Sequence, residues 1–304
     1  MILKILPRVT RANFLPASVI PFLIGAAFAY GRGFYIHPLR FTLGLAGVIT
    51  AHLAGNTLND YCDHRTGADN VEIRESPFFG GSRVIQEGLA KARDILRLAA
   101  FLFLISFLCG TGIWLLTGNP VFLVLMLVAA FLTMEYTAPP LCLAYRRFGE
   151  IDIFILFGVL LVMGSFYLFA EIFTFDSFLI SLPVAFLISD VLVCNEIPDF
   201  RADTVSGKKN LISLTGQPAG YLLYFALLAV SMLSFILNVF AGNLPPATLT
   251  VLLFYLIGVK AGLILKKDFN KLDSSIRASR MTIMLHGLVG LSMIILLAAK
   301  RFIS

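Results

Sequence analysis

Charged residues are scarce in this chain of 304 residues. Asp, Glu, Lys and Arg make up 14% of it, whereas hydrophobic residues make up 58%. A soluble globular protein usually carries about 25% charged residues, and the mean hydropathy here is +0.88. This balance excludes a water-soluble enzyme, a nucleic-acid-binding domain and a disordered chain. It is typical of a polytopic helical protein in a lipid bilayer.

Cysteine is also rare, with only four residues: Cys62, Cys109, Cys142 and Cys194. They are widely spaced and form no CxxC pair, so neither a zinc site nor a disulfide framework is indicated. The opening MILKILPRVTRANF has three basic residues but no small-residue cleavage pattern, so we expect no cleaved signal peptide. No segment points to nucleic acid or to an obligate protein partner.

Long apolar runs fill most of the sequence. One membrane crossing needs roughly 20 apolar residues, and the runs predict nine transmembrane helices. Their expected spans are 14–30, 41–62, 94–117, 120–137, 151–170, 177–198, 219–241, 246–265 and 281–300. Almost no sequence is left for a soluble part, so we expect a single intramembrane domain over residues 1–304.

Basic residues gather on one side of these spans. The N-terminus and the loops after the even-numbered spans hold 18 of the 24 Lys and Arg residues, and the opposite side holds 4. Cytoplasmic segments carry the excess of Lys and Arg, so the N-terminus is expected inside and the C-terminus outside. The longest polar loops, about 63–93 and 199–218, then lie in the cytoplasm. We therefore expect the functional site to face the cytoplasm.

A first polar cluster ends the second span. It comprises His52, Asn56, Asn59, Asp60 and Asp63, and Asp69 follows in the loop. At 100° per residue, the first five of these residues fall on one face of a helix.

A second cluster ends the sixth span, with Asn195, Glu196, Asp199 and Asp203. Asn195 and Asp199 are one turn apart. Asp203 continues the row if the helix persists past Pro198, although proline can instead loosen that last turn.

Carboxylates inside a membrane usually face an interior cavity. A single Asp at a helix end would need no function, but two such clusters four helices apart indicate a repeated half-structure. Rows of acids become useful when they hold divalent cations, and Mg²⁺ is commonly held by carboxylates together with substrate phosphates. Bridged by Mg²⁺, the two rows would clamp a diphosphate. Nearby basic residues would take up the remaining phosphate charge: Arg65, Arg83, Lys208 and Lys209.

These residues resemble the motifs of the UbiA superfamily of intramembrane prenyltransferases. Asn59-Asp60-Tyr-Cys-Asp63 is similar to the first motif, NDxxD, and Gly67 stands where that motif usually has a further acid. Asn195, Asp199 and Asp203 are similar to the second motif. The resemblance implies nine helices around a central cavity, with Asp60, Asp63, Asp199 and Asp203 as the catalytic acids. It also implies a metal set made of the same four acids with Asn59, Asp69, Asn195 and Glu196.

Other segments resemble the branch of 1,4-dihydroxy-2-naphthoate polyprenyltransferases. They are Arg11-Ala-Asn-Phe-Leu-Pro-Ala-Ser18, the loop around Arg83, the stretch from Tyr136 to Glu150, and Gly207-Lys208-Lys209-Asn-Leu211. By this resemblance the substrates are an isoprenyl diphosphate and a small aromatic acceptor. The candidates for acceptor contact are Asn56, Tyr136, Tyr145, Arg146 and Asp190.

The implied mechanism uses Mg²⁺ as a Lewis acid on the diphosphate leaving group, and the acceptor then attacks the allylic carbon. The sequence leaves other acceptors open, namely 4-hydroxybenzoate, homogentisate, a chlorophyllide-like compound and a phosphoglycerol. An ion-coupled transporter is the alternative from another class. However, carrier sites lie near the bilayer midplane, whereas these acids lie at the ends of their helices.

Overall fold

The structure is a computed structural model that describes residues 2–68, 76, 78–79 and 81–302. The described residues form helices and connecting loops, as the composition predicts. The helical elements are α1 (Ile2–Val9), η1 (Ala12–Phe14), α2 (Pro16–Gly31), α3 (Pro38–Thr66), α4 (Ala92–Thr117), α5 (Val121–Glu135), η3 (Leu143–Tyr145), α6 (Gly149–Ile153), η4 (Phe154–Leu160), α7 (Leu161–Ala170), α8 (Phe175–Val205), α9 (Ile212–Thr215), η5 (Gln217–Ala219), α10 (Gly220–Phe240), η6 (Pro246–Phe254), α11 (Tyr255–Asp268), α12 (Leu272–Ala299) and η7 (Lys300–Phe302).

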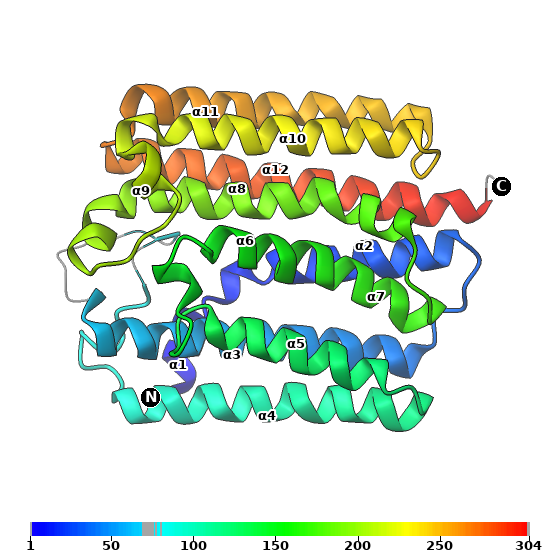
Figure 1. The fold of residues 1–304 in the computed structure, drawn as a ribbon, viewed down its shortest axis with the longest axis horizontal. Coiled ribbons are helices and arrows are strands. Elements are labelled where there is room, and N and C mark those ends of the chain that lie inside the picture. Colours follow the sequence, from blue (N-terminus) through cyan, green and yellow to red (C-terminus); the bar gives the residue numbers. More distant parts are fainter. Residues whose placement is uncertain (1, 69–75, 77, 80, 303–304) are drawn as a thin grey trace.

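Within the described residues, eight helical segments are long and apolar enough to cross a membrane. A further apolar helix, α5, occupies the place of the fourth expected span but has only 15 residues. The protein is thus an all-helical, multi-pass integral membrane protein, and the count of nine crossings stays a prediction. The long helices run side by side along the longest axis of the molecule (Figure 1).

Two helices are longer than their apolar cores. α8 continues for seven residues beyond Pro198 to Val205, and α12 begins at Leu272, although the expected span started at 281. Both extensions are mainly polar, so a search for apolar runs does not predict them. The short helix α1 was not expected either, because eight residues are too few to cross a bilayer.

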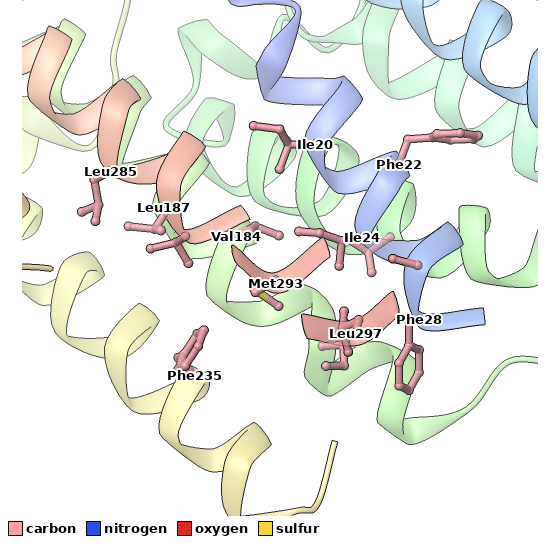
Figure 2. Close-up of a cluster of buried hydrophobic side chains, with 14 of the residues drawn as sticks. Ile20, Phe22, Ile24, Phe28, Val184, Leu187, Phe235, Leu285, Met293 and Leu297 are labelled. Atoms are coloured by element: carbon pink, nitrogen blue, oxygen red, sulfur yellow. The ribbon is translucent and has the colours of Figure 1, made fainter. Parts of the chain in front are cut away.

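The core lies where α2, α8, α10 and α12 meet. Figure 2 shows apolar side chains from these four helices converging, among them Ile24, Val184, Phe235 and Met293. By contrast, α4 leaves Phe101, Leu108 and Leu115 more than half exposed. In a bilayer such side chains face lipid, which is as apolar as they are.

Small and polar residues let the helices approach closely. A Cβ at Gly25 of α2 would lie 2.2 Å from the carbonyl oxygen of Val162, so only glycine fits there. Ser165 Oγ donates to the carbonyl of Phe22 at 2.6 Å, and Asn238 Nδ2 donates to that of Leu179 at 2.7 Å. Such bonds join neighbouring helices where lipid offers no alternative partner.

The arrangement brings the two acid clusters to one end of the bundle. α3 and α8 run in the same direction along the long axis, and their C-terminal ends both lie on the left in Figure 1, at the same end of the bundle as α9. The described end of the chain, at η7, lies at the opposite end of the bundle from α1.

Candidate active site

The first acid row occupies the last turns of α3. Asn59, Asp60 and Asp63 are buried and, at spacings of three and four residues, share one face of the helix. The helix ends at Thr66, and Gly67 follows with φ 82°, a left-handed conformation that suits glycine at a helix C-terminus.

Asp60 is held by an arginine from the N-terminal segment. Arg11 Nη2 lies 2.7 Å from Asp60 Oδ1 and 3.2 Å from Asn59 Oδ1. The backbone N–H of Ser82 donates to the same Asp60 oxygen at 3.2 Å. Asp60 is 2% exposed and Arg11 is 25% exposed, so this is a largely buried ion pair. It connects the segment before α2, the end of α3 and the loop that follows α3.

Asp63 is held from another direction. The Tyr145 hydroxyl donates to Asp63 Oδ1 at 2.8 Å and lies 2.9 Å from Thr66 Oγ1. Burial, and then the nearby Asp63 carboxylate, raise the pKa of Tyr145. The phenol therefore stays protonated at neutral pH and remains a hydrogen-bond donor.

The second row lies on α8. Because the helix persists past Pro198, Asn195, Asp199 and Asp203 keep a spacing of four residues and share one face. Asn195 Oδ1 accepts a hydrogen bond of 2.8 Å from Ser279 Oγ of α12. This contact fixes the first residue of the row against a neighbouring helix.

A basic loop closes around the last residue of that row. Asn210 Nδ2 donates to Asp203 Oδ2 at 2.8 Å, and Lys208 Nζ lies 3.8 Å from Asp203 Oδ1. Burial alone would lower the pKa of Lys208, but the carboxylates of Asp203 and Asp63 outweigh it and raise that pKa. Lys208 therefore stays charged between the two acid rows.

Both rows line one cavity of about 830 Å³, which lies within the ~300–1,000 Å³ of most ligand sites. Its polar wall contains Asn56, Asn59, Asp63, Asn195, Glu196, Asp199, Asp203, Arg11, Lys208 and Tyr136. Beyond these residues the wall is mainly apolar, with side chains such as Phe22, Phe107, Leu156 and Leu160. The cavity thus has a charged region and an apolar region.

Several predicted site residues lie elsewhere. Arg65, Lys209 and Arg146 are exposed, and Arg83 is half-buried with φ 59°. Asp190 is completely buried. Within the described part of the chain, seven predicted site residues are therefore absent from the cavity wall: Asp60, Arg65, Arg83, Tyr145, Arg146, Asp190 and Lys209. Asp69 lies outside the described residues.

Two residues of the cavity wall, Arg11 and Asp152, were not predicted as site residues from the sequence. Arg11 lies in a segment whose family resemblance was noted, but its role was not predicted. A basic residue directly before a membrane span, among two others, looks like an orientation signal. Asp152 lies in the first turn of α6, where an acid suits the positive end of the helix without any other role. Only its position in the cavity wall distinguishes it.

Residues 18–286 match the UbiA prenyltransferase family. The chain belongs to this family. It is therefore a prenyltransferase, and the transporter alternative loses its basis.

Curated UbiA relatives cover most of the chain. It is 31% identical to 1,4-dihydroxy-2-naphthoate octaprenyltransferase of Bacillus subtilis over 82% of this chain and 78% of the relative. The corresponding enzyme of Haemophilus influenzae is 30% identical over 77% of this chain and 76% of that one. A solved UbiA homologue from Archaeoglobus fulgidus, bound to DMAPP and Mg²⁺, has the same fold. Its TM-score is 0.68 at 17% identity, over 98% of this chain and 99% of the homologue.

Proposed function

We propose that this enzyme transfers a prenyl or polyprenyl group from its diphosphate to an aromatic acceptor in menaquinone-type quinone biosynthesis, and that residues 1–304 act as one catalytic domain. The observation that carries the proposal is that both acid rows line one cavity whose remaining wall is mainly apolar. A prenyl diphosphate has the same division, with a charged head and a hydrocarbon tail. The curated relatives named above act on 1,4-dihydroxy-2-naphthoate by name, which favours that acceptor.

The donor set fits Mg²⁺. The acids of both rows offer oxygen ligands, and Asp60 Oδ2 is buried without a hydrogen-bond partner in the described part of the chain. Within those residues, no three acidic, His or Cys side chains are close enough to form a complete metal site. Mg²⁺ usually takes one or two carboxylates and completes its shell with substrate phosphates and water. Asp63, Asp199 and Asp203 would hold the ion, which, when bound, neutralises and polarises the leaving diphosphate.

Cations already present in the wall complete the diphosphate site. Lys208 lies beside Asp203, and Arg11 lies beside Asp60. In each case a basic side chain accompanies the acid, so a bound diphosphate would meet positive charge from both rows. Tyr145 positions Asp63 through its hydroxyl. The exposed Arg65 and Lys209 remain candidates only if the loops move when the substrate binds.

The same charges favour an aromatic acceptor over a phosphoglycerol. A phosphate acceptor would need cations of its own beside those that serve the diphosphate. Among the described wall residues, however, Arg11 and Lys208 are the only Lys or Arg side chains, and both already pair with acids. An aromatic ring instead suits the apolar wall, which contains Phe157, Phe103 and Phe22.

We also propose that the acid rows face the cytoplasm, with the N-terminus inside and the C-terminus outside. The bias of basic residues supports this orientation, and α1 and η7 lie at opposite ends of the bundle (Figure 1). A water-soluble diphosphate head would then enter from the cytoplasm.

The test is a transfer assay with purified protein in lipid nanodiscs. Labelled prenyl diphosphates of several lengths and Mg²⁺ are combined with 1,4-dihydroxy-2-naphthoate, 4-hydroxybenzoate, homogentisate and a phosphoglycerol in turn. We expect product with the naphthoate. Product with the phosphoglycerol alone would contradict the acceptor assignment while leaving prenyl transfer intact.

A further inference from the structure

Asp152 is an unusual residue in the cavity wall. It lies on the first turn of α6, its side chain is 3% exposed, and it lines the same cavity as the two acid rows. Within the described residues, neither of its carboxylate oxygens has a hydrogen-bond partner. Buried polar groups in proteins are nearly always hydrogen-bonded, so a carboxylate with both oxygens unpaired points to a partner that binds from outside the chain.

A role as an ordinary helix-start acid does not account for it. Even the neighbouring Glu150 has a backbone partner, because its Oε1 accepts from the N–H of Leu211, the residue before α9, at 2.5 Å. A helix-start acid would accept hydrogen bonds from the N–H groups at the start of its own helix. Asp152 makes no such bond among the described residues. Its own backbone N–H already donates to the carbonyl of Phe148 at 2.8 Å, so the helix is formed without help from the side chain.

Asp152 lies at the boundary between the two regions of the cavity. On the polar side, Tyr136 also lines the wall, and its ring lies 3.4 Å from where a Cβ on Gly149, one turn before Asp152, would be. On the other side, the following wall residues of the same helical segment are apolar: Ile153, Leu156, Phe157, Leu160 and Leu161. If the diphosphate occupies the acid rows and the prenyl tail the apolar region, the reacting carbon between them lies near this boundary.

We propose that Asp152 is an acceptor-binding residue whose carboxylate accepts a hydrogen bond from a hydroxyl group of the aromatic acceptor. The proposal rests on the proposed function, because it assumes a prenyl diphosphate in the acid-lined region. The bond would hold the acceptor ring beside the reacting carbon and takes no part in bond making or breaking. The acceptor's hydroxyl group would then supply the hydrogen bond that the Asp152 carboxylate lacks within the described residues.

This role makes the enzyme selective for a hydroxyl group. A site built to bond a substrate hydroxyl rejects the analogue that lacks it, because the buried protein group is then left unpaired. A buried acceptor that is left unpaired costs enough free energy to weaken binding about tenfold to a hundredfold.

The experiment compares acceptors and variants by equilibrium binding. Protein in nanodiscs is saturated with Mg²⁺ and an unreactive prenyl thiodiphosphate. It is then titrated with 1,4-dihydroxy-2-naphthoate, 1-hydroxy-2-naphthoate or 4-hydroxy-2-naphthoate, each monohydroxy compound lacking one hydroxyl. The variants are Asp152→Asn and Asp152→Leu, and the latter removes a buried acid without adding a polar group.

Glu135→Gln is the matched control. Glu135 is a buried acid outside the described cavity wall, and its Oε2 accepts from the N–H of Leu141 at 2.7 Å, a bond that glutamine retains.

In the wild type and in Glu135→Gln, we expect loss of one particular hydroxyl to weaken binding at least about tenfold. In Asp152→Leu that preference should vanish, in Asp152→Asn it should shrink, and the KM for the prenyl diphosphate should stay unchanged. Equal preference in the wild type and Asp152→Leu would overturn the proposal, as would a loss confined to the prenyl diphosphate. If wild-type protein neither binds nor prenylates any hydroxylated aromatic, the proposed function fails, and this inference fails with it. The measurements on the wild type alone are enough to distinguish that outcome from a failure of the Asp152 role.

Discussion

Replacing Arg11 tests whether the N-terminal segment stabilises the first acid row. Asp60 is 2% exposed, and its pair with Arg11 is 2.7 Å long. Removing one partner from a buried ion pair typically costs about 3–5 kcal/mol, because the other charge is left uncompensated. Arg11 is a quarter exposed and Asp60 keeps the N–H of Ser82, so water and this bond reduce the loss. We therefore expect Arg11→Met to lower the free energy of unfolding by about 2–3 kcal/mol.

The chain contains a matched control three residues earlier. Arg8 pairs with Glu87 through two hydrogen bonds, but the two side chains are 46% and 41% exposed. Exposed pairs contribute about 0–1 kcal/mol. Arg8→Met should therefore destabilise the protein by less than about 1 kcal/mol, although it removes the same charge from the same segment.

The assay is reversible unfolding in mixed detergent micelles, followed by far-ultraviolet circular dichroism. Asp60→Asn is combined with Arg11→Met, because the neutral amide no longer needs a cation. The double variant should be more stable than Arg11→Met alone, with a coupling energy of about 1–3 kcal/mol. The reasoning is refuted if Arg11→Met costs no more than Arg8→Met, or if Asp60→Asn restores nothing.

Three further outcomes are expected. Asp63→Asn should lower turnover at least about a hundredfold, since it removes a charged ligand while nearly keeping the shape; near-normal turnover would count against its role. Arg83 lies outside the described cavity wall, so the diphosphate contact that the sequence predicts for it requires movement of its loop on substrate binding. With that contact, Arg83→Ala should raise the KM for the prenyl diphosphate in steady-state kinetics and leave that of the acceptor unchanged, whereas an unchanged KM for the prenyl diphosphate would contradict diphosphate binding by Arg83. An impermeant thiol reagent on intact cells should label single cysteines in residues 31–40 but not in 199–218, and the reverse pattern would invert the topology.

The sequence was sufficient for the fold class because membrane spans have a strong signal. A run of about 20 apolar residues matches the thickness of the bilayer and is rare in soluble proteins. The ends of the helices were harder to predict. The last turns of α8 and the first turns of α12 are polar. Backbone hydrogen bonding and neighbouring helices maintain them, and neither appears in a hydropathy pattern.

The candidate site was predictable where the chemistry repeats along one helix. Acids and amides at spacings of three and four residues share a face regardless of tertiary structure, and the structure brings both rows to one cavity. Basic residues gave no comparable signal. Lys208 lines the cavity whereas its neighbour Lys209 is exposed, because the loop that turns back over Asp203 points only one of them inward.

Arg11 and Asp152 show what the sequence could not indicate. Each is of an ordinary residue type for its position, as an orientation charge and as a helix-start acid respectively. Their places depend on contacts with residues far away in the chain. Arg11 reaches Asp60 across 49 positions, and Asp152 belongs to the same wall as Asp199 of another helix. Such long-range contacts appear only when the helices are packed.

The central claim, that the two acid rows hold a metal-bound diphosphate, is tested most directly by the Mg²⁺ dependence of prenyl transfer. Purified enzyme in nanodiscs is assayed with a labelled prenyl diphosphate and 1,4-dihydroxy-2-naphthoate, first with excess chelator and then with Mg²⁺ restored. We expect transfer to disappear with the chelator and to return with Mg²⁺ in the wild type, and Asp199→Asn should stay at least about a hundredfold slower at saturating Mg²⁺. Undiminished transfer in excess chelator would contradict the claim.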